Sequence, residues 1–280
     1  YEGEDGVIAW MLDGPDASYE VPLPEAVARF YTADVFMHTW DLARATGQPH
    51  CMDPDLAAAT LAGIDEGTRL APAAKGAGLE RPARRQLQLD RALSEDVRAF
   101  ARSRGVTLAT VMQTAWGLLL GRLTGRNDVL FGSPVSGRSG QVDGIETMIG
   151  QLGNTVVVRL THRDRDTALQ VLAAMHEQSV AMTDHHHVGL AEVHRAVGVG
   201  DLFDTLFVTE NLPMSARTGV TLAPGVQLDG VDTDDGTHYP LNVVVLPEPR
   251  IVVRFGYQRR AFDDDAVRDI GDRAITFYGG

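Results

Sequence analysis

Two neighbouring apolar runs decide the fold: residues 127–138 read Asn-Asp-Val-Leu-Phe-Gly-Ser-Pro-Val-Ser-Gly-Arg, and residues 149–160 read Ile-Gly-Gln-Leu-Gly-Asn-Thr-Val-Val-Val-Arg-Leu. Each run is short, apolar and bounded by small residues, which is typical of a buried strand. Polar side chains stand at the strand ends: Ser136, Arg138, Asn154 and Thr155. A polar group there needs a partner or faces a cavity, so we predict that these four residues line a binding site. The alternative is that Arg138 and Asn154 only satisfy loop carbonyl groups, and the residues alone do not decide between the two.

The composition bounds the class of protein. The chain has 280 residues, of which 44% are hydrophobic and 22% charged, enough for one large domain or two modest ones with a real core. The net charge of −13 argues against nucleic-acid or anionic membrane partners. The single cysteine, Cys51, excludes an internal disulfide and fits a cytoplasmic location. The chain opens on Tyr1 and closes inside a helical pattern, so we expect a piece of a longer polypeptide.

Helical and strand patterns alternate along the rest of the chain. Periodicity and capping residues predict a hairpin within 1–22, helices at 94–105, 107–123, 167–183, 190–197 and from 264, and strands at 86–89, 206–209, 226–231, 241–246 and 251–257. Ser94 is the expected N-cap of the first of these helices. Helices that alternate with strands before the strands gather into a meander predict an α/β (α+β) fold with a mixed sheet and packed helices.

A polar stretch rich in proline and glycine separates two regions. We predict a short, mainly helical N-terminal segment at 1–66, a linker at 67–85 and a lobe at 86–280. In the first region a helix from Pro24 to Gly47 places His38 on its apolar face. One histidine makes no metal site, because three or four ligands must converge, so the residues alone favour a structural His38.

The triplet His185-His186-His187 is the most conspicuous candidate for metal binding or acid–base chemistry. Consecutive side chains diverge on both helices and strands, so three in a row rarely bind one ion. A histidine acting as general base needs a supporting acid, and the flanking sequence offers only Asp184. We therefore interpret the triplet as a loop that packs against the domain before a short helix.

These stretches resemble the C-terminal lobe of a condensation domain of non-ribosomal peptide synthetases, from about Leu79 to Phe277. Residues 149–155 resemble the family's Gly-x-Phe-Val-Asn-Thr motif, with Leu152-Gly153 in place of Phe-Val, and residues 131–138 resemble the preceding strand and its Gly-Arg turn. Further stretches follow in the family's order: 185–192 at the His-Gln-Asp segment, 202–211 at the Pro-Leu-Phe-x-x-x-Phe strand, then 238–241 and 262–263. The resemblance implies a fold related to chloramphenicol acetyltransferase.

The family's catalytic His-His-x-x-x-Asp-Gly motif has no counterpart in this sequence. Counting from His185 puts the Asp and Gly slots on Leu190 and Ala191, and counting from His186 puts them on Ala191 and Glu192. The resemblance therefore implies half of a condensation domain, with no catalytic residue of its own. It also implies an acyltransferase reaction between acyl and aminoacyl thioesters on phosphopantetheine arms of carrier proteins, in a tunnel whose other wall is an N-terminal lobe. This lobe itself is expected to bind no cofactor.

Residues 31–47 carry a second resemblance. They are similar to the His-x-Trp-Asp-Leu-Ala-Arg-Ala-Thr-Gly helix of DinB-like proteins related to mycothiol-dependent maleylpyruvate isomerase. In that family the residue matching His38 is a metal ligand, which implies a divalent metal if the partner ligands are supplied. Three hypotheses follow. The leading one is a condensation lobe that is inactive alone. The alternatives are a DinB-like metal-dependent thiol transferase or isomerase, and a non-catalytic module that binds carrier proteins.

Overall fold

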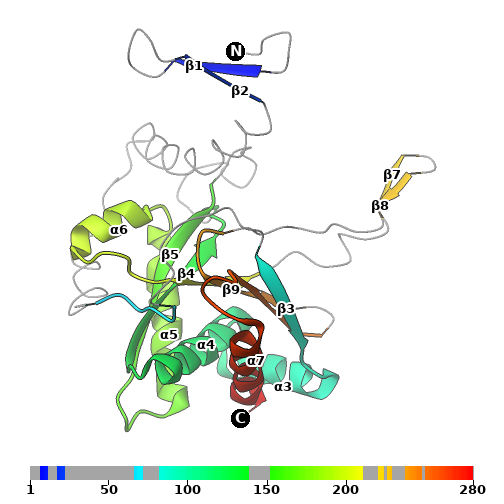
Figure 1. Ribbon diagram of the computed structural model, residues 1–280. Helices are drawn as coiled ribbons and strands as arrows, with labels where there is room; N and C mark the ends of the chain where they lie inside the picture. Colours follow the sequence, from blue (N-terminus) through cyan, green and yellow to red (C-terminus); the bar gives the residue numbers. More distant parts are fainter. Residues whose placement is uncertain are drawn as a thin grey trace.

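A six-stranded mixed sheet forms the centre of the computed structural model, with the order β3-β10-β9-β6-β4-β5 (Figure 1). Its strands are β3 (Ala83–Gln88), β4 (Asp128–Val135), β5 (Asn154–Thr161), β6 (Thr205–Thr209), β9 (Leu241–Leu246) and β10 (Val252–Tyr257). β6 runs parallel to β4 and β9, and the other neighbouring pairs are antiparallel. The structure describes residues 7–11, 18–22, 66–71, 82–138, 152–210, 220–223, 226–228, 237–247 and 250–279.

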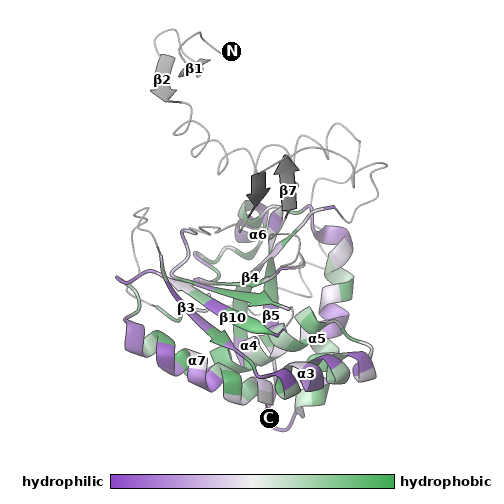
Figure 2. Ribbon diagram, turned by 90° about the vertical axis from the view of Figure 1, so that its right-hand side faces the viewer, coloured by the Kyte–Doolittle hydropathy of each residue, from purple (hydrophilic) through white to green (hydrophobic). Residues whose placement is uncertain are grey.

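Helices cover both faces of this sheet. A large apolar cluster joins one face to α3 (Arg91–Arg104), α4 (Leu108–Thr124), α5 (Ala168–Met182) and α7 (Asp264–Gly279). A smaller cluster joins β4, β5 and β6 to α6 (Leu190–Val197). Figure 2 shows the apolar colouring of the central strands and the mixed polar and apolar surfaces of α3 and α7. The mixed α/β fold expected from the sequence is confirmed, and the strand expected at 86–89 is found as β3, at one edge of the sheet.

Two small hairpins complete the described elements. β1 (Val7–Met11) pairs with β2 (Ser18–Pro22), as the sequence predicts for residues 1–22. β7 (Val220–Ala223) pairs with β8 (Val226–Leu228). The predicted helix that carries His38 lies outside the described residues.

Local signals place most helix ends where the sequence predicts them. Thr107 caps α4 by accepting a hydrogen bond from the Thr110 N–H, and Gly105 ends α3 with a φ of 67°. The predicted N-cap at Ser94 is wrong. The cap is Asp90, whose carboxylate accepts from the Leu93 N–H at 2.8 Å. Ser94 is instead buried within α3. Its hydroxyl accepts a hydrogen bond from the Ile251 N–H, just before β10, at 3.1 Å, and this contact outweighs the preference of serine for a capping position.

Both ends of the stretch predicted as a linker make ordered contacts with the sheet. Residues 66–71, which we call the strap, are held by Asp204: its Oδ2 accepts from the Leu70 and Ala71 N–H groups at 2.9 and 2.7 Å. At the other end β3 begins at Ala83. Residues 72–81 lie outside the described structure, so the domain boundaries at 66 and 85 stay predictions.

The buried Asp204 carboxyl predicts a specific pH dependence of stability. Burial raises its pKa above the usual 3.8, and the two strap N–H groups oppose this only in part. The folded state therefore holds the proton more tightly than the unfolded state. The carboxyl's contribution to the free energy of unfolding is fully present below the ordinary pKa and is lost as pH rises through the raised pKa. Asp204→Asn, which cannot ionise, should gain stability relative to the parent as pH rises from about 4 to about 7. Urea denaturation of both proteins across that range checks this, and a pH-independent difference would contradict it.

Candidate functional site

The four predicted site residues lie at one edge of the sheet. β4 and β5 are antiparallel, with Val135 opposite Asn154 and Pro134 opposite Thr155. Ser136 and Arg138 follow directly on the end of β4, so the two polar strand ends lie next to each other. That they line a binding site stays a prediction. The Arg138 N–H donates a hydrogen bond to the Ser136 hydroxyl at 3.4 Å. The register of one antiparallel pair thus brings the two motifs together.

A glycine holds the two motifs in contact. Gly137 has a φ of +61°, and a Cβ built on it would lie 1.7 Å from the carbonyl oxygen of Leu152. Only glycine fits this left-handed position against another backbone. The sequence places Gly137 in a Gly-Arg turn but gives no sign of this crossing, because Leu152 approaches only in the folded chain.

Asn154 fastens the histidine loop to the start of β5. Its side-chain amide donates to the carbonyl oxygens of His186 and Val188 at 2.9 and 2.6 Å, and its Oδ1 accepts from the Thr155 N–H at 2.8 Å. This is the contact with loop carbonyls that the alternative interpretation expects. Asn154 therefore shapes the edge by holding a loop, and direct contact between Asn154 and a substrate stays a prediction.

The histidine triplet forms the loop that the sequence predicts. A 3-10 turn at Thr183–His185 leads through the buried Val188 into α6. The rings of His185 and His187 lie 6.4 Å apart. Burial lowers the pKa of His186, with Asp184 opposing the shift, so its imidazole is neutral at pH 7. A neutral ring beside carbonyls already bound by Asn154 fits packing of the loop against the domain.

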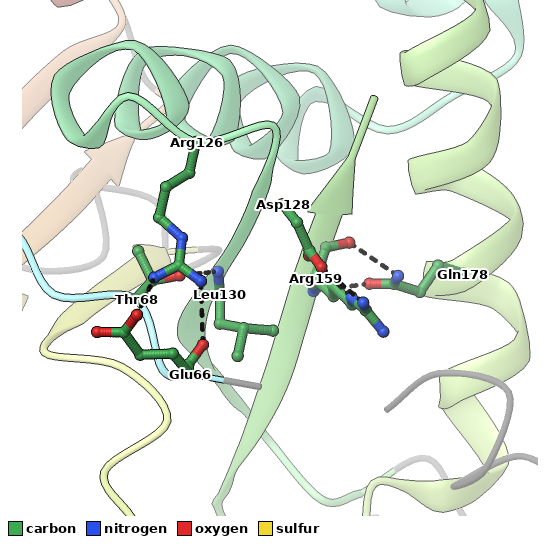
Figure 3. Close-up of polar contacts among 7 residues, drawn as sticks. All are labelled: Glu66, Thr68, Arg126, Asp128, Leu130, Arg159 and Gln178. Carbon is green, nitrogen blue, oxygen red and sulfur yellow. Dashed lines mark hydrogen bonds and ion pairs between the residues drawn. The ribbon is translucent and has the colours of Figure 1, made fainter. Parts of the chain in front are cut away.

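A polar clamp that the sequence did not reveal holds β5 in place (Figure 3). The Arg159 guanidinium binds both Asp128 carboxylate oxygens, at 2.9 and 2.6 Å, and the pKa of Arg159 is raised by this hydrogen bonding. On the free edge of β5 the Gln178 amide accepts from the Arg159 N–H at 3.1 Å and donates to the Arg159 carbonyl at 2.9 Å. Gln178 thus takes the place of a neighbouring strand. In the sequence, the one sign of this clamp was Arg159, a charged residue inside the apolar run at 156–160.

Replacing Asn154 by alanine should cost about 1–3 kcal/mol of unfolding free energy, because two loop carbonyls lose their donor. Asn127→Ala is the matched control: the Asn127 amide makes one exposed hydrogen bond, to Asp164 at 3.0 Å, and its loss should cost less than about 0.5 kcal/mol. Chemical denaturation measures both. Equal, small losses would show that the Asn154 contacts do not stabilise the fold.

Metal ligands do not gather in the described part of the chain. Across its ranges, no three His, Cys, Asp or Glu side chains are placed to hold one ion. His38 falls outside those ranges, so its role as a ligand stays a prediction. None of the described helices is long and apolar enough to cross a bilayer.

Comparison with known proteins identifies the family. A family model described as Condensation domain matches residues 69–277. Vanchrobactin synthetase VabF of Vibrio anguillarum is 35% identical over 175 residues, covering 62% of this chain and 6% of that protein. Tyrocidine synthase 2 of Brevibacillus parabrevis is 32% identical over 193 residues, covering 68% of this chain and 5% of that protein. The chain therefore spans a small part of the synthetases it matches.

Solved structures agree on the fold. The first condensation domain of the calcium-dependent antibiotic synthetase superimposes with a TM-score of 0.62 at 18% identity, covering 91% of this chain and 56% of that one. The starter condensation domain of rhizomide synthetase, solved with C8-CoA and Leu-SNAC, gives a TM-score of 0.65 at 20% identity, covering 81% and 51%. The chain spans about half of these solved domains. With the family model matching most of its length, this chain belongs to the condensation domain family.

Proposed function

We propose that this chain supplies one lobe of a non-ribosomal peptide synthetase condensation domain, an acyltransferase that forms amide bonds. The observation that carries the proposal is the family match over residues 69–277, together with two synthetases at 35% and 32% identity. The edge formed by β4 and β5 then serves as one wall of the substrate tunnel. Ser136, Arg138 and Thr155 lie at this wall, and Asn154 holds the loop that borders it.

The chemistry that this wall would serve is acyl transfer between two carrier-bound thioesters. The amine nitrogen of the acceptor attacks the carbonyl carbon of the donor thioester, the new C–N bond forms and the C–S bond breaks. The phosphopantetheine thiol leaves with the proton that the amine loses. Both arms are covalently held by carrier proteins, so their encounter inside a closed tunnel replaces a bimolecular collision.

We assign the proton-transfer histidine to a second lobe. The sequence has no His-His-x-x-x-Asp-Gly motif, and His186, whose carbonyl oxygen accepts from the Asn154 amide, lies in a packed loop. This chain would then bind and orient the arms, while a lobe that carries the motif accepts the proton. Alone, the chain should give no turnover.

Reconstitution tests this assignment. The chain is mixed with a donor-loaded and an acceptor-loaded carrier protein, with and without a separately produced lobe that carries His-His-x-x-x-Asp-Gly. Mass spectrometry of the acceptor carrier should show the dipeptidyl product only when both lobes are present. The control is the same second lobe with its motif histidine changed to alanine. Product from this chain alone would refute the assignment of the histidine.

A non-catalytic module that binds carrier proteins is the competing interpretation of the same lobe. Calorimetric titration of a phosphopantetheinylated carrier into the chain measures binding without turnover. Binding without product, when the second lobe is present and active with its own partner, would favour this interpretation. Loss of binding in variants of the β4–β5 edge would place the carrier arm there.

The cytoplasm stays the expected location of the whole chain. For residues 1–66 the DinB-like interpretation also stays a prediction. Elemental analysis of the purified protein tests the DinB-like interpretation. Stoichiometric zinc or nickel that is lost in His38→Ala would support a metal site, and a metal-free protein after refolding with either ion would contradict it.

A further inference from the structure

The strap, residues 66–71, fills a gap in the sheet. Its Thr68 is 1% exposed and forms an isolated parallel bridge with Phe203, just before β6. The Thr68 N–H donates to the Leu202 carbonyl at 2.8 Å. On its other side the Thr68 hydroxyl accepts from the Leu130 N–H of β4, also at 2.8 Å (Figure 3). Thr68 therefore stands between β4 and the chain that enters β6.

β4 and β6 barely pair with each other. The described register between them is the single pair Gly132 and Leu206, whereas β6 and β9 pair over five residues. Toward the end of β4, Pro134 has no N–H to offer a neighbour. Toward its start, the Leu130 N–H goes to Thr68. The separation of β4 from β6 is thus set by one central contact and by the strap.

The contact between Gly132 and Leu206 is too tightly packed to allow adjustment. A Cβ built on Gly132 would lie 2.4 Å from the Phe203 ring and 2.6 Å from the Leu206 side chain. Both side chains are buried and cover the glycine. Because the contact is a fixed point with the strap on one side of it, a change at the strap should turn β4 about this point.

Several further contacts hold the strap in one position. A Cβ built on Gly67 would lie 2.0 Å from the Asp201 carbonyl oxygen, so the backbones touch. The Arg126 guanidinium donates to the Glu66 carbonyl at 3.2 Å (Figure 3). It also donates to the Gly67 carbonyl, at 3.1 Å. The Asp204 carboxylate accepts hydrogen bonds from the N–H groups of Leu70 and Ala71, at the end of the strap. A six-residue stretch with this many backbone contacts has one register and resists sliding.

We propose that the strap is a positioning device, in which Thr68 sets the separation of β4 from β6 and thereby the placement of the β4–β5 edge. β4 and β5 pair over eight residues, from Asp128 opposite Thr161 to Val135 opposite Asn154, and the Arg159 clamp on Asp128 closes the end opposite Asn154. Because each strand rises about 3.3 Å per residue and the two are hydrogen-bonded along their length, the pair should move as one rigid body. A shift at Leu130 would then displace Asn154 at the other end of the pair. The importance of that edge rests on the proposed function, but the positioning itself does not.

NMR of the full-length isotope-labelled chain tests the proposal without any turnover. Thr68→Val keeps the shape but removes the acceptor for the Leu130 N–H, and Thr68→Ser, which keeps the acceptor, is the matched control. Thr68→Val should speed hydrogen exchange of the Leu130 amide about tenfold or more. It should also shift the side-chain amide resonances of Asn154. Thr68→Ser should leave both unchanged.

Each outcome decides the proposal. A faster Leu130 amide with unmoved Asn154 resonances would reduce the strap to a local anchor and overturn the positioning role. An unchanged Leu130 amide would overturn the contact itself. Should Thr68→Val not fold, Arg126→Gln removes two bonds to the strap from a partly exposed side chain, and it should move the same two signals in the same direction by less. Failure of the reconstitution with both NMR effects present would refute the proposed function and leave the positioning role standing.

Discussion

Gly137→Ala is expected to cost about 2–5 kcal/mol of unfolding free energy. An alanine at a φ of +61° pays about 1–2 kcal/mol for the left-handed conformation. Its Cβ would also lie 1.7 Å from the Leu152 carbonyl oxygen, and relieving such an overlap costs about 1–3 kcal/mol more. Because Leu152 belongs to the backbone, no side chain can swing away. The turn after β4 must move, and the β4–β5 edge with it.

Gly125→Ala separates the two contributions. Gly125 ends α4 at a φ of +68°, but a Cβ there meets nothing within 4 Å. Its replacement should therefore cost only the conformational part, about 1–2 kcal/mol. Urea denaturation of both variants measures the difference. Equal losses would mean that Gly137 and Leu152 do not touch, which would contradict the close backbone contact between the two sequence motifs.

Trp116→Ala is expected to cost about 3–5 kcal/mol, the usual range for emptying a buried tryptophan position. Trp116 is 0% exposed on α4, and it belongs to the large apolar cluster that joins the sheet to α3, α5 and α7. The cavity would open beneath the sheet, and α4 contacts too many partners for the walls to collapse. Thermal and urea denaturation of the variant measure the loss.

Trp116→Phe is the control for that cavity. The indole Nε1 is buried and has no hydrogen-bond partner among the described residues. Phenylalanine keeps most of the volume and removes this unpaired donor, so the cost should stay below about 1.5 kcal/mol. If phenylalanine costs as much as alanine, the indole N–H must have a partner that stabilises the fold.

Predictions based on short-range chemistry were the successful ones. α6 and β9 have the bounds expected for them, and α4 begins after Thr107, because capping and periodicity act within a few residues. Where two residues compete for the same role, these rules fail. Asp90 and Ser94 are both good N-caps, and the sequence does not show that Ser94 is engaged by the distant Ile251 N–H.

The proximity of the candidate residues could be predicted in part for the same reason, while their role in a site stays a prediction. Polar residues at strand ends are visible in a sequence, and the antiparallel register of β4 and β5 brings Ser136 and Arg138 beside Asn154 and Thr155. Their partners are not visible. The loop carbonyl of His186 is 32 positions from Asn154, and Gln178 is 19 from Arg159. A side-chain amide can bind any backbone N–H or carbonyl that lies in the right position. The residue types in the sequence therefore do not reveal which backbone group it binds.

The sequence by itself determined the mixed α/β class, most elements and the two polar strand ends around residues 127–160, because periodicity, caps and strand patterns are written locally. Only the tertiary structure decided that Gly137 crosses Leu152 and that Asn154 fastens the histidine loop. It also decided that residues 66–71, which look like a linker, enter the sheet beside β4. Glycine and small polar residues permit a free linker and a close backbone approach equally well. The choice between the two is made by Asp204 and Leu130, more than sixty residues away in the chain.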